Sequence, residues 1–77
     1  MKKILKKKST KATLSLREIE VLKWCSMGKS NSVIAEILSI SEKTVEFHFT
    51  TIFRKLEVSG RMLAVLKAIE LRLIKGS

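Results

Sequence analysis

Residues 31–56 constrain the fold of this chain more than any other stretch; they read NSVIAEILSISEKTVEFHFTTIFRKL. Apolar residues in the second half recur at the spacing of one helical face: Val45, Phe49, Ile52, Phe53 and Leu56. A shorter apolar group in the first half is spaced to face one way: Val33, Ile34, Ile37 and Leu38. Between the two groups, Ser39 and Ile40 form a turn, and the Ser41 hydroxyl can cap the second helix by accepting from a free backbone N–H. The stretch therefore predicts a short helix, a tight turn and a longer helix over about residues 41–56.

The longer helix also has an outer face, which carries Lys43, Glu46, Phe47, Thr50 and Arg54. A buried short helix that holds a longer helix with a polar outer face is the helix-turn-helix arrangement. In that arrangement the second helix can enter the major groove of DNA. The period alone is a weak signal, since many helical pairs imitate it.

Positive charge is concentrated at the N-terminus. The 77-residue chain has a net charge of +9, and residues 1–13 contain six lysines and no acidic residue. We expect a flexible basic arm over residues 1–13, followed by one folded domain over residues 14–77. Such an arm favours nucleic acid or an anionic membrane, and a purely solubilising tail is as good an interpretation as a DNA-contacting arm. The arm lacks the apolar core of an export signal and no apolar run could span a membrane, so we expect a cytoplasmic protein without a membrane partner.

A first helix is predicted before this stretch. Ser15 and Glu18 have the spacing of a capping box at its start, and Gly28 suits the left-handed residue past its end. The residues expected on its inner face are Leu16, Ile19, Leu22, Trp24 and Cys25. Cys25 is the only cysteine, so no internal disulfide is expected, and a small buried hydrophobe is favoured over a redox sensor.

A fourth helix is predicted from about Arg61 to Leu73, with Ser59 as its N-cap. Apolar residues cover most of its circumference, which is more than one helix of a four-helix domain usually buries. We therefore expect self-association through this helix, although a helix wrapped deeply into its own core is the alternative. The residues expected at the dimer interface are Leu63, Lys67, Glu70, Leu71 and Ile74. With no proline and no convincing strand, the predicted fold class is all-α, with four helices.

Several groups of residues now combine into a family pattern. They are Leu14-Ser15-x-Arg17-Glu18-x-Glu20-Val21-Leu22, Gly28-Lys29-Ser30-Asn31-x-x-Ile34-Ala35, Ile40-Ser41-x-x-Thr44-Val45-x-x-His48, Lys55-Leu56-x-Val58 and Arg61-x-x-Ala64. In this order and spacing they resemble the LuxR-type (GerE-like) helix-turn-helix DNA-binding domain over about residues 14–75. Because the groups are separate and correctly ordered, the resemblance is strong.

The resemblance implies a domain of bacterial transcription regulators. It implies a recognition helix over about residues 41–56 and dimers paired through the fourth helix, about residues 60–73, with RNA polymerase as a further candidate partner. Phe47-His48 is the form seen in many quorum-sensing members, which usually carry an acyl-homoserine-lactone domain ahead of this one. We expect either a stand-alone regulator of the GerE type or the output domain of a larger regulator.

The chain departs from the family pattern at a few positions. Val33 stands where a glutamate often completes a second capping box from Ser30. Glu46 and Thr50 stand where response-regulator members frequently carry basic residues that contact DNA, and Thr51 stands where Asn is common. These changes leave the predicted fold intact and leave the family's usual base contacts open.

Candidate DNA-contacting residues lie at the starts of the two helices and along the outer face of the longer one. They are Lys29, Ser30, Asn31, Ser41, Lys43, Thr44, Glu46, Phe47, Thr50, Thr51, Arg54 and Lys55. Phosphate contacts would supply affinity, and base contacts from Lys43, Glu46, Phe47 and Thr50 would supply specificity. Phe47 could instead pack as a semi-buried aromatic against the first helix, and Arg54 or Lys55 could lie on a solvated face.

No catalytic residue, metal site or cofactor is predicted. His48 is the only histidine, there is no aspartate, and Cys25 has no second cysteine to join it in a metal site or triad. We expect a sequence-specific transcription regulator that binds roughly palindromic double-stranded DNA as a homodimer, and not an enzyme. Two alternatives remain: a protein-interaction module that docks through the apolar fourth helix, and a membrane-surface peptide driven by the arm.

Overall fold

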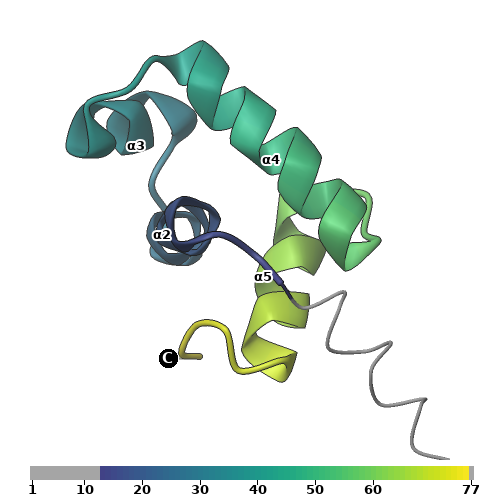
Figure 1. The fold of residues 1–77 in the computed structure, drawn as a ribbon. Coiled ribbons are helices and arrows are strands. Elements are labelled where there is room, and N and C mark those ends of the chain that lie inside the picture. The colour runs from purple at the N-terminus through teal and green to yellow at the C-terminus, as the bar shows by residue number, and fades with distance from the viewer. Residues whose placement is uncertain (1–12, 77) are drawn as a thin grey trace, which may run out of the picture.

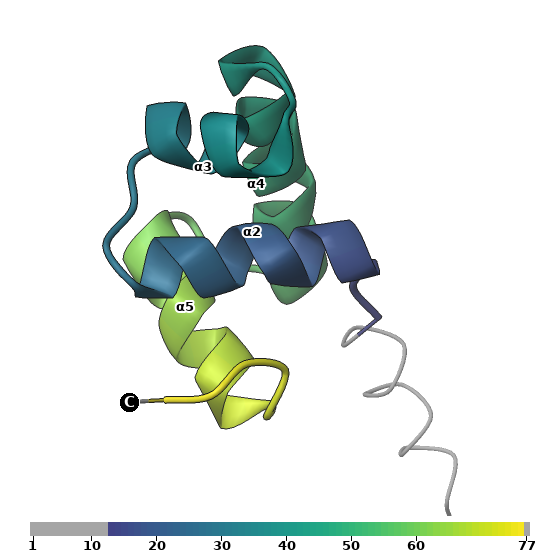
Figure 2. The same ribbon diagram turned by 90° about the vertical axis from the view of Figure 1, so that its left-hand side faces the viewer.

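The computed structural model describes residues 13–76, which form four helices and no strand (Figure 1). The helices are α2 (Leu16–Ser26), α3 (Asn31–Leu38), α4 (Glu42–Leu56) and α5 (Arg61–Glu70). α2 packs against each of the other three helices, with α3 above it and the end of α5 below it in Figure 2. The all-α, four-helix fold class is therefore confirmed. The expected basic arm lies, apart from Thr13, outside the described residues.

Side-chain hydroxyls cap three of the four helix starts. The predicted capping box of α2 is present: the Ser15 hydroxyl accepts from the Glu18 N–H at 3.1 Å, and the Glu18 carboxylate accepts from the Ser15 N–H at 2.9 Å. Ser41 caps α4 by accepting from the Thr44 N–H at 3.0 Å, as predicted. α5 differs, because its N-cap is Gly60 with no side-chain hydrogen bond. The prediction of Ser59 as the cap was one residue early, since the extended residue before the helix is Gly60.

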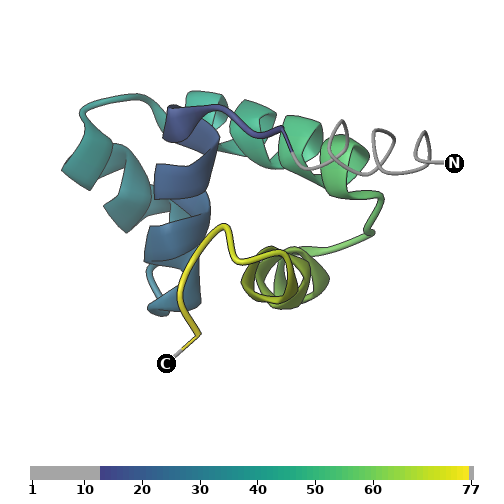
Figure 3. The ribbon, with the colours of Figure 1, turned by 60° about the horizontal axis from the view of Figure 1, so that its bottom comes forward.

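All four helices end in the same way. A residue with positive φ follows each helix, and the N–H of the next residue donates to a carbonyl five positions earlier, which satisfies groups that the helix end leaves free. The positive-φ residues are Gly28, Ser39, Glu57 and Arg72. At α5, Leu73 N–H donates to the Ala68 carbonyl at 2.8 Å, so the helix ends at Glu70 and not at Leu73 as predicted. The chain then folds back past α2, as Figure 3 shows in yellow beside the end-on α5.

The core lies between the four helices. Its buried hydrophobic residues are Val21, Leu22, Ile34, Ala35, Val45, Phe49, Ile52, Leu56, Ala64, Ala68 and Ile74. The inner face predicted for the longer helix is confirmed, with Phe53 only partly buried. Because these side chains hold α4 along its length, the orientation of its opposite face is set by the core.

Two expectations about inner faces were wrong. Leu16 is 82% exposed, because the buried stripe of α2 runs through Glu18, Val21 and Leu22, and Leu16 lies on the far side of that stripe. In α3, Val33 and Ile37 are exposed, because this eight-residue helix rests on the core through Ile34 and Ala35. Apolar residue counts alone did not set the rotation of either helix about its axis.

Candidate nucleic-acid interface

The outer face of α4 is free of contacts with the core. Its five predicted residues, Lys43, Glu46, Phe47, Thr50 and Arg54, are all exposed, and they lie opposite the buried stripe of the same helix. Phe47 is 67% exposed, so the alternative of a semi-buried aromatic is wrong. The nearest ring to Phe47 is that of its neighbour His48, at 6.3 Å between centroids. This face is a polar ridge with one aromatic side chain in its middle.

The N-terminus of α4 carries two hydroxyls. Ser41 Oγ and Thr44 Oγ1 lie 2.9 Å apart, and Ser41 also accepts from the Thr44 backbone. The first-turn N–H groups of a helix attract anions, and Lys43 adds an exposed positive charge beside them. Capping therefore occupies one acceptor of Ser41 and leaves this end of the helix suited to a phosphate.

The start of α3 is arranged in a similar way. The Ser30 hydroxyl accepts from the Val33 N–H at 3.3 Å. Because Val33 stands where a glutamate is common, no carboxylate returns a second hydrogen bond to the Ser30 backbone. Lys29 and Ser30 are exposed, whereas Asn31 is partly buried. The Asn31 side chain is already engaged, because its Oδ1 accepts from Arg61 Nη2 at 2.6 Å.

Arg61 is a residue that the reasoning from sequence missed as part of this region. Its guanidinium lies 4.3 Å from the centre of the Phe49 ring, within the range of a cation–π contact, and Nη1 lies 3.9 Å from Cys25 Sγ. Through these contacts the first residue of α5 joins the end of α2, the start of α3 and the inner face of α4. No local signal could identify it, because the residues it contacts are distant in the sequence.

Lys55 has a partner within the domain. Its Nζ donates to Glu18 Oε1 at 3.0 Å, and the Glu18 residue is only 5% exposed. Burial raises the pKa of Glu18, but hydrogen bonds from the Ser15 N–H and from Lys55, with the Lys55 charge, together hold the pKa below the ordinary value of 4.5. The ion pair ties the end of α4 to the start of α2, so Lys55 does not lie on the solvated face considered as an alternative from sequence.

The other predicted residues of α4 are divided between the outer face and its border. The Thr50 hydroxyl donates to the Glu46 carbonyl at 3.2 Å, which leaves its methyl group and lone pairs on the exposed side. Thr51 and His48 are partly buried and flank this face. Among residues 13–76, no cluster of three or more His, Cys, Asp or Glu side chains could hold a metal ion.

α5 has an exposed apolar surface. Met62, Leu63, Leu66 and Leu71 are all exposed, with Leu66 at 55%, and Lys67 and Glu70 are exposed beside them. Ile74 does not belong to this surface. It is 8% exposed and lies in the core, because the chain turns at Arg72 and carries Ile74 back between α5 and α2. The inclusion of Ile74 among the dimer residues was therefore wrong.

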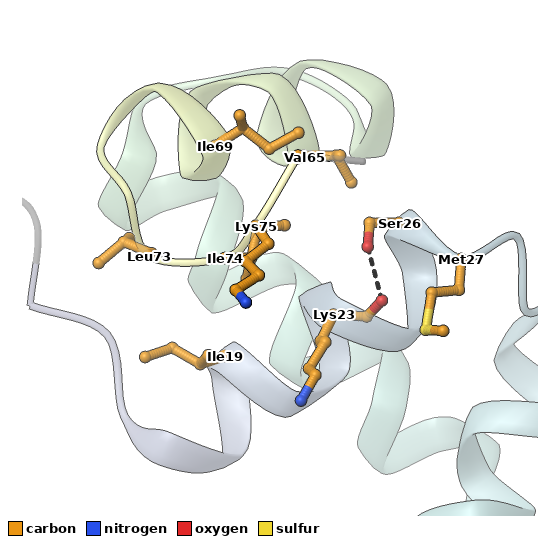
Figure 4. Close-up of a pocket in the computed structure, with 10 residues that line it drawn as sticks. Ile19, Lys23, Ser26, Met27, Val65, Ile69, Leu73, Ile74 and Lys75 are labelled. Carbon is orange, nitrogen blue, oxygen red and sulfur yellow. Dashed lines mark hydrogen bonds between the residues drawn. The ribbon is translucent and has the colours of Figure 1, made fainter.

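A cleft of about 690 Å³ lies between α2 and the end of α5 (Figure 4). Its wall combines apolar side chains such as Ile19 and Ile69 with the exposed Lys23 and Lys75. None of the residues that line it belongs to α3 or α4. The cleft is therefore separate from the helix-turn-helix surface.

Residues 12–68 match the sequence pattern of the family described as "Bacterial regulatory proteins, luxR family". The chain belongs to the luxR family. The fold agrees with this assignment: the structure of the transcription factor GerE superposes with a TM-score of 0.78 at 37% identity, covering 80% of this chain and 92% of GerE.

Two longer transcription regulators are similar to most of this chain. The chain is 47% identical over 66 residues to the HTH-type quorum-sensing regulator RhlR of Pseudomonas aeruginosa, covering 86% of the chain and 27% of RhlR. It is 45% identical over 62 residues to the HTH-type quorum sensing-dependent transcriptional regulator RpaR of Rhodopseudomonas palustris, covering 80% of the chain and 26% of RpaR. The chain thus spans about a quarter of the length of these relatives.

Proposed function

We propose that this domain binds double-stranded DNA with sequence specificity and regulates transcription as a homodimer. α4 would lie in the major groove, and α5 would pair two copies so that two α4 helices meet a roughly palindromic site. In this proposal the bound dimer acts on RNA polymerase in the cytoplasm. As regards membranes, none of the helices in the described range is long and apolar enough to cross one.

The observation that carries the DNA-binding proposal is the two-sided character of α4. One side is buried through Val45, Phe49 and Ile52, and the other presents five exposed residues that no element within residues 13–76 covers. The similarity to GerE supports the same orientation of this helix in a transcription factor. Proposed phosphate contacts lie at the two helix starts, from Lys29, Ser30, Ser41 and Thr44, and along α4 from Arg54.

The base-reading residues proposed are Lys43, Glu46, Phe47 and Thr50. A lysine can reach guanine acceptors, a glutamate can accept from the cytosine amino group, and threonine can do either. Thr51 is proposed to support this set from the border of the face. Asn31 and Lys55 are assigned a structural role instead, since Arg61 and Glu18 already occupy their side chains.

The dimer is proposed on the exposed apolar surface of α5, with Leu63 and Leu71 at its centre and Lys67 and Glu70 at its edge. Isolated exposed leucines are ordinary, but three large apolar side chains on a ten-residue helix, with Leu71 directly after it, are typical of an association surface. The surface of one short helix is small, so we expect dimerisation to be weak in solution and strengthened on DNA.

Selection of binders from a pool of random DNA duplexes at near-physiological salt tests the proposal. Enriched inverted repeats would support a two-fold dimer that reads sequence, and Lys43→Ala or Thr50→Ala should then change the enriched bases. Enrichment of a sequence without an inverted repeat would support sequence reading by a monomer and would contradict the homodimer. The absence of enrichment, with binding that disappears as salt rises, would contradict the proposal, because only the sequence-independent charge term would remain.

A further inference from the structure

Phe47 is an apolar side chain on a surface that is otherwise polar. The residue is 67% exposed in the middle of the outer face of α4, with Lys43 one turn before it and Thr50 one turn after it. The core of the domain does not need this ring, because the aromatic contacts inside the core are made by Phe49 and Phe53, whose centroids lie 5.7 Å apart. The ring is therefore available for a ligand that approaches α4.

The chemistry of the major groove limits what this ring can meet. Every base pair presents hydrogen-bond donors and acceptors in the groove, and a phenyl ring cannot replace a polar partner for them. Covering such an edge with the ring would leave polar groups without partners, which is unfavourable. The one apolar group that an unmodified base pair presents there is the C5-methyl group of thymine.

We propose that Phe47 reads a C5-methyl group in the major groove, so that the domain distinguishes thymine, and equally 5-methylcytosine, from bases without this methyl. The inference rests on the proposed function and names the chemical group that one residue of the recognition surface detects. Because 5-methylcytosine carries its methyl at the same ring position as thymine, cytosine methylation at the contacted base pair would strengthen binding.

Removing single methyl groups from the DNA tests this inference. In a duplex obtained by the selection described above, each thymine is replaced in turn by deoxyuridine, which keeps every hydrogen-bonding group and lacks only the methyl. For the unaltered protein we expect the affinity to fall about fourfold at one thymine in each half-site, which is the effect of withdrawing one buried methyl-sized group. Phe47→Ala should bind thymine and deoxyuridine equally at that position, whereas Phe47→Leu should retain a preference for the methyl.

A second arm uses methylated cytosine. The contacted thymine–adenine pair is changed to cytosine–guanine, and the duplex is measured with and without a methyl at cytosine C5. The unaltered protein should recover about fourfold in affinity on methylation, and Phe47→Ala should recover nothing. Thr50→Ala is the comparison variant, since a threonine methyl can also contact thymine; loss of methyl dependence in Thr50→Ala but not in Phe47→Ala would assign the reading to Thr50 and overturn the inference.

The outcomes separate this inference from the proposed function. Sequence-specific binding with equal affinity for thymine and deoxyuridine at every position would leave the proposed function standing and overturn the role of Phe47. Failure to enrich any sequence would overturn both. Thermal unfolding of Phe47→Ala within about 2 °C of the unaltered protein would show that a loss of methyl dependence is not a loss of folding.

Discussion

α4 and α5 are both exposed on one side and buried on the other, but they divide their residues in opposite ways. α4 turns its large apolar side chains inward, with Val45 and Ile52 fully buried, and leaves a mostly polar face outside. α5 buries only the small side chains of Ala64 and Ala68 among its own residues and leaves Met62 and Leu66 exposed. The first arrangement stabilises the isolated domain, whereas the second leaves apolar area of α5 in contact with water.

The two helices also differ in how their ends are capped and held. α4 is capped by Ser41 and held near its other end by the Lys55–Glu18 pair. α5 has Gly60 as its N-cap and therefore no side-chain cap, although its first residue, Arg61, contacts three other elements. The outer face of α4 is therefore held at both ends of the helix, while α5 packs through small buried residues and exposes larger apolar ones.

The largest effect on stability is expected at the inner face of α4. Ile52→Ala should lower the free energy of unfolding by about 2–5 kcal/mol, because it removes a fully buried side chain and leaves a cavity. Phe47→Ala removes an even larger side chain from the opposite face and should change stability by about 0.5 kcal/mol or less. Urea denaturation measures both.

If Ile52→Ala fails to fold, Ile52→Val keeps the test open, with an expected loss of about 0.5–1.5 kcal/mol. Equal losses for Ile52→Val and Phe47→Ala would contradict the assignment of the two faces of α4.

The second effect concerns the outer surface of α5. The double substitution Leu63→Ala with Leu66→Ala should raise the Kd of the homodimer about a hundredfold, since roughly 2–3 kcal/mol of apolar burial over the two protomers is lost. Sedimentation equilibrium measures the change. Leu16→Ala, at an 82% exposed leucine of α2, is the matched control and should leave the dimer unchanged. A dimer that survives the double substitution would place the association surface elsewhere.

A third, smaller effect concerns the tie between α4 and α2. Glu18→Gln should lower the free energy of unfolding by about 1–2 kcal/mol at pH 7, because a buried, charge-assisted hydrogen bond with Lys55 is weakened. The pKa of Glu18 is lowered in the folded state, so its contribution is fully present above about pH 4.5 and is lost as the pH falls through the folded-state pKa. The difference between the two proteins should therefore shrink in acid.

Thermal unfolding from pH 7 down to pH 3 measures this difference. Glu20→Gln is the matched control on the same helix, because Glu20 forms an exposed pair with Arg17 at 3.4 Å and such pairs contribute little. A Glu18→Gln curve that follows the Glu20→Gln curve at all pH values would mean that the Lys55 pair does not stabilise the fold.

The smallest effects are expected at the helix caps. Ser41→Ala should cost about 1 kcal/mol, because α4 loses the acceptor for the Thr44 N–H. Gly60→Ser should instead stabilise the protein by a few tenths of a kcal/mol, because Gly60 has an extended φ of −165° and nothing lies within 4 Å of an added Cβ. Calorimetry of both variants measures the shifts, and a destabilising Gly60→Ser would contradict this description of the α5 start.

Much of the site could be predicted from sequence because its signals are local. The period of Val45, Ile52 and Leu56 sets the inner face of α4 and, by exclusion, the outer one. The phase of α2 could not be predicted in this way. Its buried stripe includes the charged Glu18, whose partner Lys55 lies 37 positions away. The apolar residues alone therefore predicted Leu16 on the inner face of α2, whereas Leu16 is exposed in the structure.

The sequence by itself determined the number of helices, the caps at Ser15 and Ser41 and the family, since these depend on neighbours within about one turn or on residue spacing. Only the tertiary structure decided that Phe47 is exposed and that Ile74 lies in the core. It also decided that Lys55 is hydrogen-bonded to Glu18 and Asn31 to Arg61. The reason is physical: an exposed fraction or an ion pair depends on which surfaces meet, and residues 18 and 55 or 31 and 61 meet only after the helices pack.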